Sequence, residues 1–154
     1  MALPANISAR HLTPGEVPLL RPLLAELRTH HNAVSTDFSG VFPLVSPDRE
    51  LPHIAEQITK GEARVEAFFA GSDLVAFSVA SHEYGLGSVD LVYVVPEYRR
   101  RGLARRAVEL SIAYLKENDV RLIDIHVVHG NVAARRLYKS MGFRLRSEVL
   151  SMRV

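Results

Sequence analysis

Three short apolar segments follow one another closely, and they constrain the fold more than any other feature of the sequence. Residues 63–70, 74–82 and 88–95 are rich in valine, alanine, leucine and phenylalanine. Glycine-containing turns at residues 71–73 and 84–87 separate them. Short apolar runs bounded by such turns predict β-strands. Because the links are short, we expect the three strands to pair antiparallel.

The segment before these strands is predicted to be mostly helical. Residues 7–12 are expected to form a first strand, and residues 13–16 match a capping box that opens a helix reaching about residue 30. Apolar residues recur there at helical spacing. Pro18 and Pro22 disfavour a regular helix at its start, so we expect a kink or a later start. A second helix is predicted over residues 48–60, followed by a stop at Gly61.

Helices and strands alternate after the three central strands. The spacing predicts a helix over residues 102–118, a strand over 121–128, a helix over 132–141 and a sixth strand over 143–154. A strand, a helix and a following strand normally form a right-handed crossover between parallel neighbours. The expected class is therefore α+β (α/β), a mixed central sheet in the order β-α-α-β-β-β-α-β-α-β. Residues 1–154 are expected to form a single domain.

Composition excludes several classes of protein. The chain has 154 residues and no cysteine, which excludes disulfides, thiolate metal sites and a cysteine nucleophile. No apolar run approaches the length of a membrane span. The first seven residues lack the features of a secretory signal, so we expect a cytoplasmic protein with no membrane contact. Residues 1–86 carry 6 basic and 10 acidic side chains, whereas residues 87–154 carry 13 and 7. This difference suggests separate partners for the two parts.

A basic, glycine-containing turn lies between the strand ending near residue 95 and the helix that begins at Gly102. Three consecutive arginines, Arg99, Arg100 and Arg101, precede the glycine, and Ala104 follows it. The first N–H groups of a helix have no partner inside the helix, and the helix dipole favours an anion at that end. Gly102 has no Cβ, so a phosphate could approach the backbone closely. The turn is therefore predicted to bind a phosphate-like anion.

A second motif covers residues 131–143. Asn131 is a suitable N-cap for the helix, and Gly142 a suitable residue to end it. Ala134, Leu137, Tyr138 and Met141 share one face of that helix. By itself, this pattern requires no role beyond core packing for Tyr138.

Together, the two motifs resemble the GNAT superfamily of N-acetyltransferases. Arg99-Arg-Arg-Gly102-Leu-Ala104 resembles its pyrophosphate-binding motif, and Asn-x-x-Ala-x-x-x-Tyr-x-x-x-Gly-Phe from Asn131 is similar to its second hallmark. The resemblance implies strands four and five splayed to hold acetyl-CoA, with the Val94 backbone binding the thioester carbonyl. The cofactor-binding residues implied are Val92, Tyr93, Val94, Val95, Arg99, Arg100, Arg101, Gly102, Leu103, Ala104, Arg105 and Asn131.

The resemblance also implies the chemistry. An acetyl group would pass from acetyl-CoA to a primary amine by direct attack in a ternary complex, with Tyr138 protonating the leaving thiolate. A tyrosine with an ordinary pKa of about 10 is protonated at neutral pH and can act as such an acid. An acyl-CoA-binding regulatory module on the same fold, without catalysis, is the alternative. A degenerate dinucleotide fingerprint starting at Gly102 is disfavoured, because three antiparallel strands precede it.

His126 is the first candidate for the base that takes the proton from the amine. It lies five residues before Asn131, where some GNAT members carry a base glutamate, and histidine has a suitable pKa of about 6.5. Glu83, Asp90 and a bound water are the alternatives. We expect no metal site, because His126 and His129 would point to opposite faces of a strand.

The acceptor is expected to be a small-molecule or peptide amine bound near residues 27–48, which include His30 and His31. The acidic first part of the chain weakly favours a cationic acceptor. Nucleic acid is not an expected partner, because the arginine triplet lacks interleaved aromatics apart from Tyr98. Many GNAT members form dimers, so the resemblance leaves a homodimer open.

Overall fold

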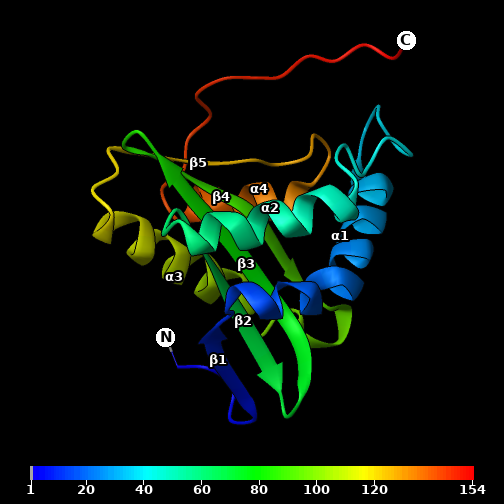
Figure 1. Cartoon of the computed structure of the whole chain (residues 1–154). Helices are drawn as coiled ribbons and strands as arrows, with labels where there is room; N and C mark the ends of the chain where they lie inside the picture. The colour runs from blue at the N-terminus through cyan, green and yellow to red at the C-terminus, as the bar shows by residue number, and fades with distance from the viewer. Residues whose placement is uncertain (1) are drawn as a thin grey trace.

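The computed structural model describes residues 2–154 and contains one five-stranded sheet with helices on both faces (Figure 1). The strands are β1 (Ile7–His11), β2 (Ala63–Ala70), β3 (Asp73–Glu83), β4 (Leu86–Val94) and β5 (Leu122–Ile125). The helices are η1 (Pro14–Leu20), α1 (Arg21–Val34), α2 (Pro47–Thr59), η2 (Pro96–Tyr98), α3 (Leu103–Glu117) and α4 (Val132–Ser140).

The strands lie in the sheet in the order β1-β2-β3-β4-β5. The first four pair antiparallel, and β5 pairs parallel with β4. The mixed α+β sheet and the crossover through α3 are thereby confirmed. The strand β2 matches its predicted range, and β3 extends slightly beyond both predicted bounds. The strand β4 starts earlier than predicted, at Leu86, and ends at Val94 instead of residue 95.

The prolines near the start of the first helix have the expected effect. A 3₁₀ helix, η1, contains Pro18, and the α-helix starts only at Arg21, with Pro22 in its first turn. Proline lacks an N–H and tolerates only the first turn of an α-helix. The expected later start is therefore confirmed. The helix continues to Val34, beyond the predicted end near residue 30.

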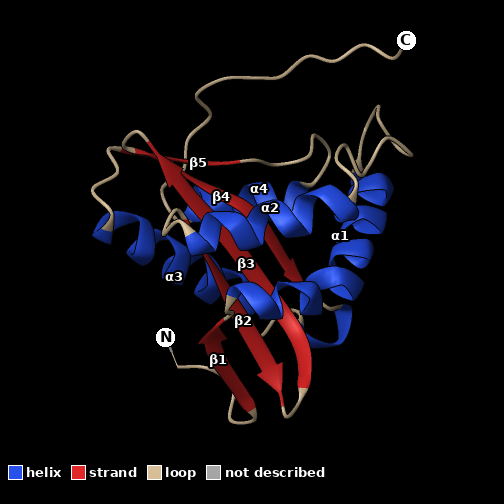
Figure 2. Cartoon of the chain, viewed as in Figure 1, coloured by secondary structure: helices blue, strands red, loops and turns tan. Residues whose placement is uncertain are grey.

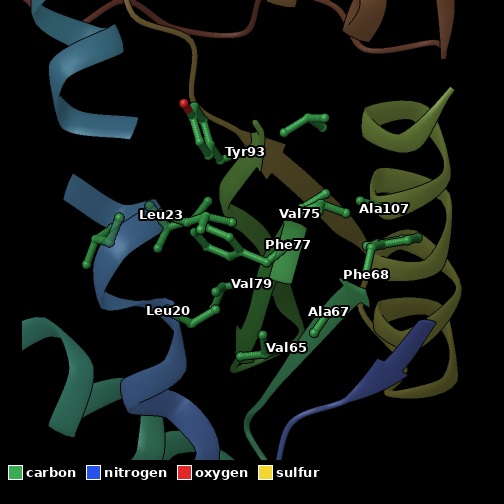
Figure 3. Close-up of a cluster of buried hydrophobic side chains, with 14 of the residues drawn as sticks. Leu20, Leu23, Val65, Ala67, Phe68, Val75, Phe77, Val79, Tyr93 and Ala107 are labelled. Carbon is green, nitrogen blue, oxygen red and sulfur yellow. The ribbon is translucent and has the colours of Figure 1, made fainter. Parts of the chain in front are cut away.

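Apolar side chains fill both sides of the sheet (Figure 3). On one side, Leu20 and Leu23 pack towards Phe77 and Val79. On the other side, Phe68 lies towards Ala107 of α3. The helices α1 and α2 thus cover one face, and α3 covers the other, with α4 behind β4 (Figure 2). The period-2 side-chain alternation of a strand requires such a two-sided cover when both faces are apolar.

The predicted sixth strand is wrong. Residues 143–154 form no strand, and the segment runs away from the sheet (Figure 1, red). Leu150 and Met152 are 91% and 85% exposed. The alternating pattern of this segment specifies an extended backbone but not a neighbour with which it can form hydrogen bonds, and a strand needs both.

None of the helices within residues 2–154 combines the length and the hydrophobicity that a bilayer crossing requires.

Candidate functional site

The pairing of β4 with β5 stops halfway along β4. The last paired residues are Val89 and Ile125. The next residue of β4, Asp90, is an extra residue in the ladder with β3, where the register shifts opposite Val79 and Ala80. A bulge bends a strand and increases its twist, so β4 turns where β5 ends. The fifth strand was predicted to reach residue 128, but it ends at Ile125.

The second half of β4 therefore has backbone groups directed away from β3 with no strand beside them. Val95 N–H bonds to Val75 of β3 over 2.9 Å, and successive residues of a strand point to opposite neighbours. The N–H and carbonyl of Val94 consequently point towards the side on which β5 has ended. The Val94 carbonyl accepts a 3.0 Å hydrogen bond from Arg99 Nε. The Val94 N–H is thus oriented to donate to a ligand.

The turn between β4 and α3 has the backbone geometry of an anion site. Arg100 and Gly102 both have left-handed conformations, with φ values of 61° and 81°. Gly102 is the N-cap of α3, and no side chain caps the helix. The first N–H groups of α3 are therefore open to a ligand at the positive end of the helix dipole. Glycine is favoured at this φ because it lacks the Cβ that strains other residues.

The arginines around this turn have different environments. Arg100 and Arg101 are exposed, and Arg101 stacks on the Tyr98 ring with a distance of 4.9 Å from its Cζ to the ring centroid. Within residues 2–154, neither forms an ion pair. Arg105 Nη2 donates to Ser140 Oγ over 2.7 Å and so links α3 to the end of α4. Arg99 instead contacts β4, and its Cζ lies 5.5 Å from the centroid of the Tyr93 ring.

The second motif forms the helix that the sequence predicts. Asn131 Oδ1 accepts a 3.2 Å hydrogen bond from the N–H of Ala134, which confirms the N-cap. Gly142, with φ 99°, follows the end of α4. Tyr138 is 8% exposed, and its ring makes an edge contact with Phe143 at a centroid distance of 6.2 Å. Burial raises the pKa of Tyr138 to about 12.

The candidate bases lie at opposite ends of β5: His126 and Asp90 lie near its last residue, whereas Glu83 pairs with Leu86, which lies opposite Leu122, the first residue of β5. His126 is the residue after the strand and is exposed. Since Ile125 lies opposite Val89, His126 begins the segment that faces the unpaired half of β4. Asp90 accepts a 2.6 Å hydrogen bond from Ser81, and Glu83 is exposed at the end of β3. His126 thus directly follows the last residue of β5 that pairs with β4, while Asp90 already has a hydrogen-bonding partner.

The helix α1 adds polar groups on the other side of β4. The Tyr93 hydroxyl points out of the apolar cluster, and it donates to Glu26 Oε1 over 3.3 Å (Figure 3). Partial burial, together with the positive charge of Arg99, lowers the pKa of His30. Glu26 and His30 are one helical turn apart, so they share a face. The sequence pointed to His30, but Glu26 has no motif around it that could have identified it.

The two adjacent histidines have different roles. His31 packs edge-on against Phe42 at a centroid distance of 5.2 Å. Burial first, and then the charge of Arg28, lowers the pKa of His31 to about 4. His31 therefore packs against the loop after α1 as a neutral side chain, whereas His30 lies near enough to Arg99 for that charge to affect it.

Gly130 was not identified as a site residue from the sequence. Its φ is 110°, and a Cβ there would lie 2.2 Å from the Val34 carbonyl oxygen. The neighbouring His129 carbonyl accepts a 3.0 Å hydrogen bond from Thr36 N–H. This close contact between the end of α1 and the segment before Asn131 requires glycine. In the sequence, an isolated Gly-Asn pair indicates only a turn.

Within residues 2–154, no three histidine, aspartate or glutamate side chains are grouped as metal ligands.

A family model described as the acetyltransferase (GNAT) family matches residues 31–143. The chain belongs to this family. It is 29% identical over 101 residues to an uncharacterized N-acetyltransferase of Archaeoglobus fulgidus, which covers 66% of this chain and 65% of that protein. It is also 35% identical over 65 residues to the mycothiol acetyltransferase of Tsukamurella paurometabola, covering 42% of this chain but 22% of the relative. The chain therefore matches less than two thirds of either relative.

Solved GNAT structures share the fold. The PaiA N-acetyltransferase of Thermoplasma acidophilum, solved in complex with coenzyme A, superposes with a TM-score of 0.79. That alignment covers 93% of this chain and 92% of the other, at 15% identity.

Proposed function

We propose that this protein transfers an acetyl group from acetyl-CoA to a primary amine. One observation carries the proposal: an uncapped helix N-terminus, flanked by two exposed arginines, adjoins the half of β4 that β5 leaves unpaired. An elongated ligand with a pyrophosphate at one end and an acyl group at the other matches both features. The CoA complex of the PaiA structure supports this proposal by similarity of fold.

The donor would lie beside the second half of β4, beyond Val89, where β5 no longer pairs with it. Its pyrophosphate would accept hydrogen bonds from the N–H groups of Leu103, Ala104 and Arg105, with Arg100 and Arg101 supplying charge. Its pantetheine arm would run beside Val92 and Val94. The arm would take the place of the strand that is absent from this half of β4. The remaining contacts proposed are those of Tyr93, Val95, Arg99, Gly102 and Asn131.

The proposed chemistry uses the Val94 backbone at the end of β4 and the Tyr138 hydroxyl of α4. The amine nitrogen attacks the thioester carbonyl carbon, and the C–S bond breaks as the amide forms. The Val94 N–H is oriented to donate to the carbonyl oxygen, where negative charge develops. Tyr138 would donate its hydroxyl proton to the departing sulfur. Because its pKa is about 12, the phenol keeps that proton throughout the neutral range.

The amine would approach from the α1 side of β4. The Glu26 carboxylate, held beside the Tyr93 hydroxyl, could attract an ammonium group, and His30 could accept a hydrogen bond. His126 is proposed to take the proton that the amine loses. Among structural neighbours, the AAC(6')-Iy aminoglycoside acetyltransferase and a ribosomal-protein-alanine N-acetyltransferase indicate that this fold serves both small molecules and proteins.

The donor site is tested with two acyl donors. We expect the Arg100→Gln/Arg101→Gln variant to raise the KM for acetyl-CoA about 10- to 100-fold, because each lost charge-assisted contact costs about 1–3 kcal/mol before solvent screening. The KM for S-acetylpantetheine, which lacks the pyrophosphate, should stay within about two-fold. Thiol release, corrected for hydrolysis, is measured with a panel of polyamines, amino acids, aminoglycosides and peptides.

The control is Arg49→Gln on α2, which removes an exposed arginine away from the turn. An equal rise in KM for acetyl-CoA and for S-acetylpantetheine would refute the pyrophosphate site. Binding of acetyl-CoA by calorimetry without thiol release from any amine would support the regulatory alternative instead.

The proposed base is tested by pH dependence. A histidine that must accept a proton makes kcat/KM fall as pH drops below the pKa of that histidine. We expect His126→Ala to lower kcat/KM about 10²-fold at neutral pH and to remove that acid limb. His30→Ala should weaken amine binding but retain the limb. An unchanged profile for His126→Ala would eliminate His126 and leave Glu83, Asp90 or water as the base.

A further inference from the structure

A buried carboxylate lies on the α3 side of the sheet, and the proposed acetyl transfer makes no use of it. Glu66 of β2 is only 3% exposed. It is two residues from Phe68 and therefore on the same face of the strand, and Figure 3 shows Phe68 directed towards α3. Burial of an ionised carboxylate is costly unless the charge has partners. The partners of Glu66 therefore need to be identified.

His11 of β1 is the partner that the structure shows. It lies opposite Glu66 in the strand register, and its Nε2 is 3.2 Å from Glu66 Oε2. The His11 side chain is itself 54% exposed. Within residues 2–154, no hydrogen bond to the other carboxylate oxygen, Oε1, accompanies this pair. One oxygen of a deeply buried carboxylate is thus left for a further donor.

A pocket of about 400 Å³ adjoins this carboxylate, and we call it the β1–α3 pocket. Its volume is within the range of about 300–1,000 Å³ that is typical of small-molecule sites. Glu66 and His11 form part of its lining. Apolar side chains form another part of the lining, namely those of Leu3, Ala9 and Leu110. A buried anion beside an apolar wall is a site for a ligand that has both a polar and an apolar part.

Arg106 of α3 brings a positive charge to the same pocket. It belongs to the lining, and its charge acts on Glu66. Its ion pair with Glu109 is long, at 3.5 Å. Arg105, the residue before it, donates to Ser140 of α4, and successive helix residues point about 100° apart. The β1–α3 pocket is thus on a different side of α3 from α4, and none of the proposed cofactor-binding residues lines it.

The charges in the β1–α3 pocket discriminate between ligands. A simple amine would be attracted by Glu66 and repelled by Arg106, and a simple carboxylate would experience the reverse. Arg10 also lines the pocket, but it already pairs with Glu16 over 2.7 Å. We propose that the pocket binds a free α-amino acid with an apolar side chain. Its ammonium group would contact Glu66, its carboxylate Arg106 and its side chain Leu110.

Binding of such a ligand has a predicted pH dependence, because the ammonium group requires Glu66 in its ionised form. Burial raises the pKa of Glu66 and outweighs the opposing charges of His11 and two arginines. Those arginines are Arg64 of β2 and Arg106 of α3, and Glu117 of α3 adds to the rise. Affinity should therefore increase as pH rises from about 5 to about 8. Protonated His11 competes for the same carboxylate, so its titration acts in the same direction.

Calorimetry with L-leucine and two analogues of single charge tests the ligand class. Isoamylamine is leucine without the carboxylate, and 4-methylpentanoate is leucine without the ammonium group. We expect L-leucine to bind with a Kd of about 1 mM or below at neutral pH. Each analogue should bind at least about 10-fold more weakly, because each loses one charge-assisted contact.

Two substitutions in the β1–α3 pocket should weaken leucine binding for different reasons. Glu66→Gln removes the charge, so the Kd should rise at least about 10-fold and the pH dependence should disappear. Ala9→Leu keeps the carboxylate but fills part of the pocket, so it should weaken binding even if Glu66→Gln fails to fold. Circular dichroism shows whether each variant is folded.

Two other glutamates provide matched controls. Glu56→Gln changes an exposed glutamate of α2, on the opposite face of the sheet, and should bind leucine normally. Glu26→Gln changes the proposed amine site and should also retain leucine binding, which separates the β1–α3 pocket from the site of the acetyl acceptor.

Three results would overturn the proposal. They are no binding of L-leucine at about 20 mM, binding of isoamylamine as tight as that of L-leucine, and leucine binding that the folded pocket variants leave unchanged. None of these measurements requires acetyl-CoA, so the result is independent of acetyl transfer.

Discussion

Replacing Tyr138 by phenylalanine is expected to lower kcat about 100-fold while the Kd for acetyl-CoA stays within about two-fold. General acid catalysis contributes about 10²–10⁴ to a rate. The substitution removes the hydroxyl but keeps the ring, so the contact with Phe143 should survive. Kinetics with the best amine of the panel and calorimetry with acetyl-CoA measure the two quantities.

We expect the effect of this substitution on kcat to be independent of pH around neutrality. Because burial raises the pKa of Tyr138 to about 12, the hydroxyl remains protonated through neutral and mildly alkaline pH. The ratio of wild-type to variant kcat should therefore not change between about pH 7 and pH 9. Tyr84→Phe, at the exposed turn between β3 and β4, is the control and should be fully active. If Tyr138→Phe retained wild-type kcat, the proton on the sulfur would have to come from another group.

Replacing Gly130 by alanine is expected to destabilise the protein by about 3 kcal/mol or more. A non-glycine residue at strained φ costs about 1–3 kcal/mol, and here the added Cβ would also collide with the Val34 carbonyl. For a chain of this size, that loss lowers Tm by about 6–12 °C. Because Asn131 follows directly, kcat/KM should fall as well. Thermal unfolding by circular dichroism gives the first quantity.

Gly142 offers a matched control for the collision. Its φ of 99° is similar, but a Cβ there meets nothing within 4 Å. Gly142→Ala should therefore introduce only the backbone strain, about 1–3 kcal/mol, without the added collision. Equal Tm losses in the two variants would show that the contact with the end of α1 does not require glycine.

Local sequence patterns were sufficient for most secondary structure. The β2 range, the delayed start of α1 after Pro18 and the Asn131 cap were predicted from the chain and are present. Each depends on neighbours within a few residues, because periodicity, proline geometry and capping are local effects.

The predictions that failed concern pairing between distant segments. The strand predicted over residues 121–128 ends at Ile125, because its parallel partner bends at the Asp90 bulge. Residues 143–154 have a strand-like pattern but pair with no strand within the described chain. A side-chain period identifies an extended segment but does not determine its neighbour.

The sequence by itself determined the element order as far as α4, the glycine turn before α3 and the two motifs that indicated the GNAT family. Only the tertiary structure decided that Arg99 lies on the Val94 carbonyl, that Glu26 faces Tyr93, and that Gly130 contacts the end of α1. The physical reason is one of range. Backbone preferences act over a few residues, whereas these contacts join segments brought together only when the core packs.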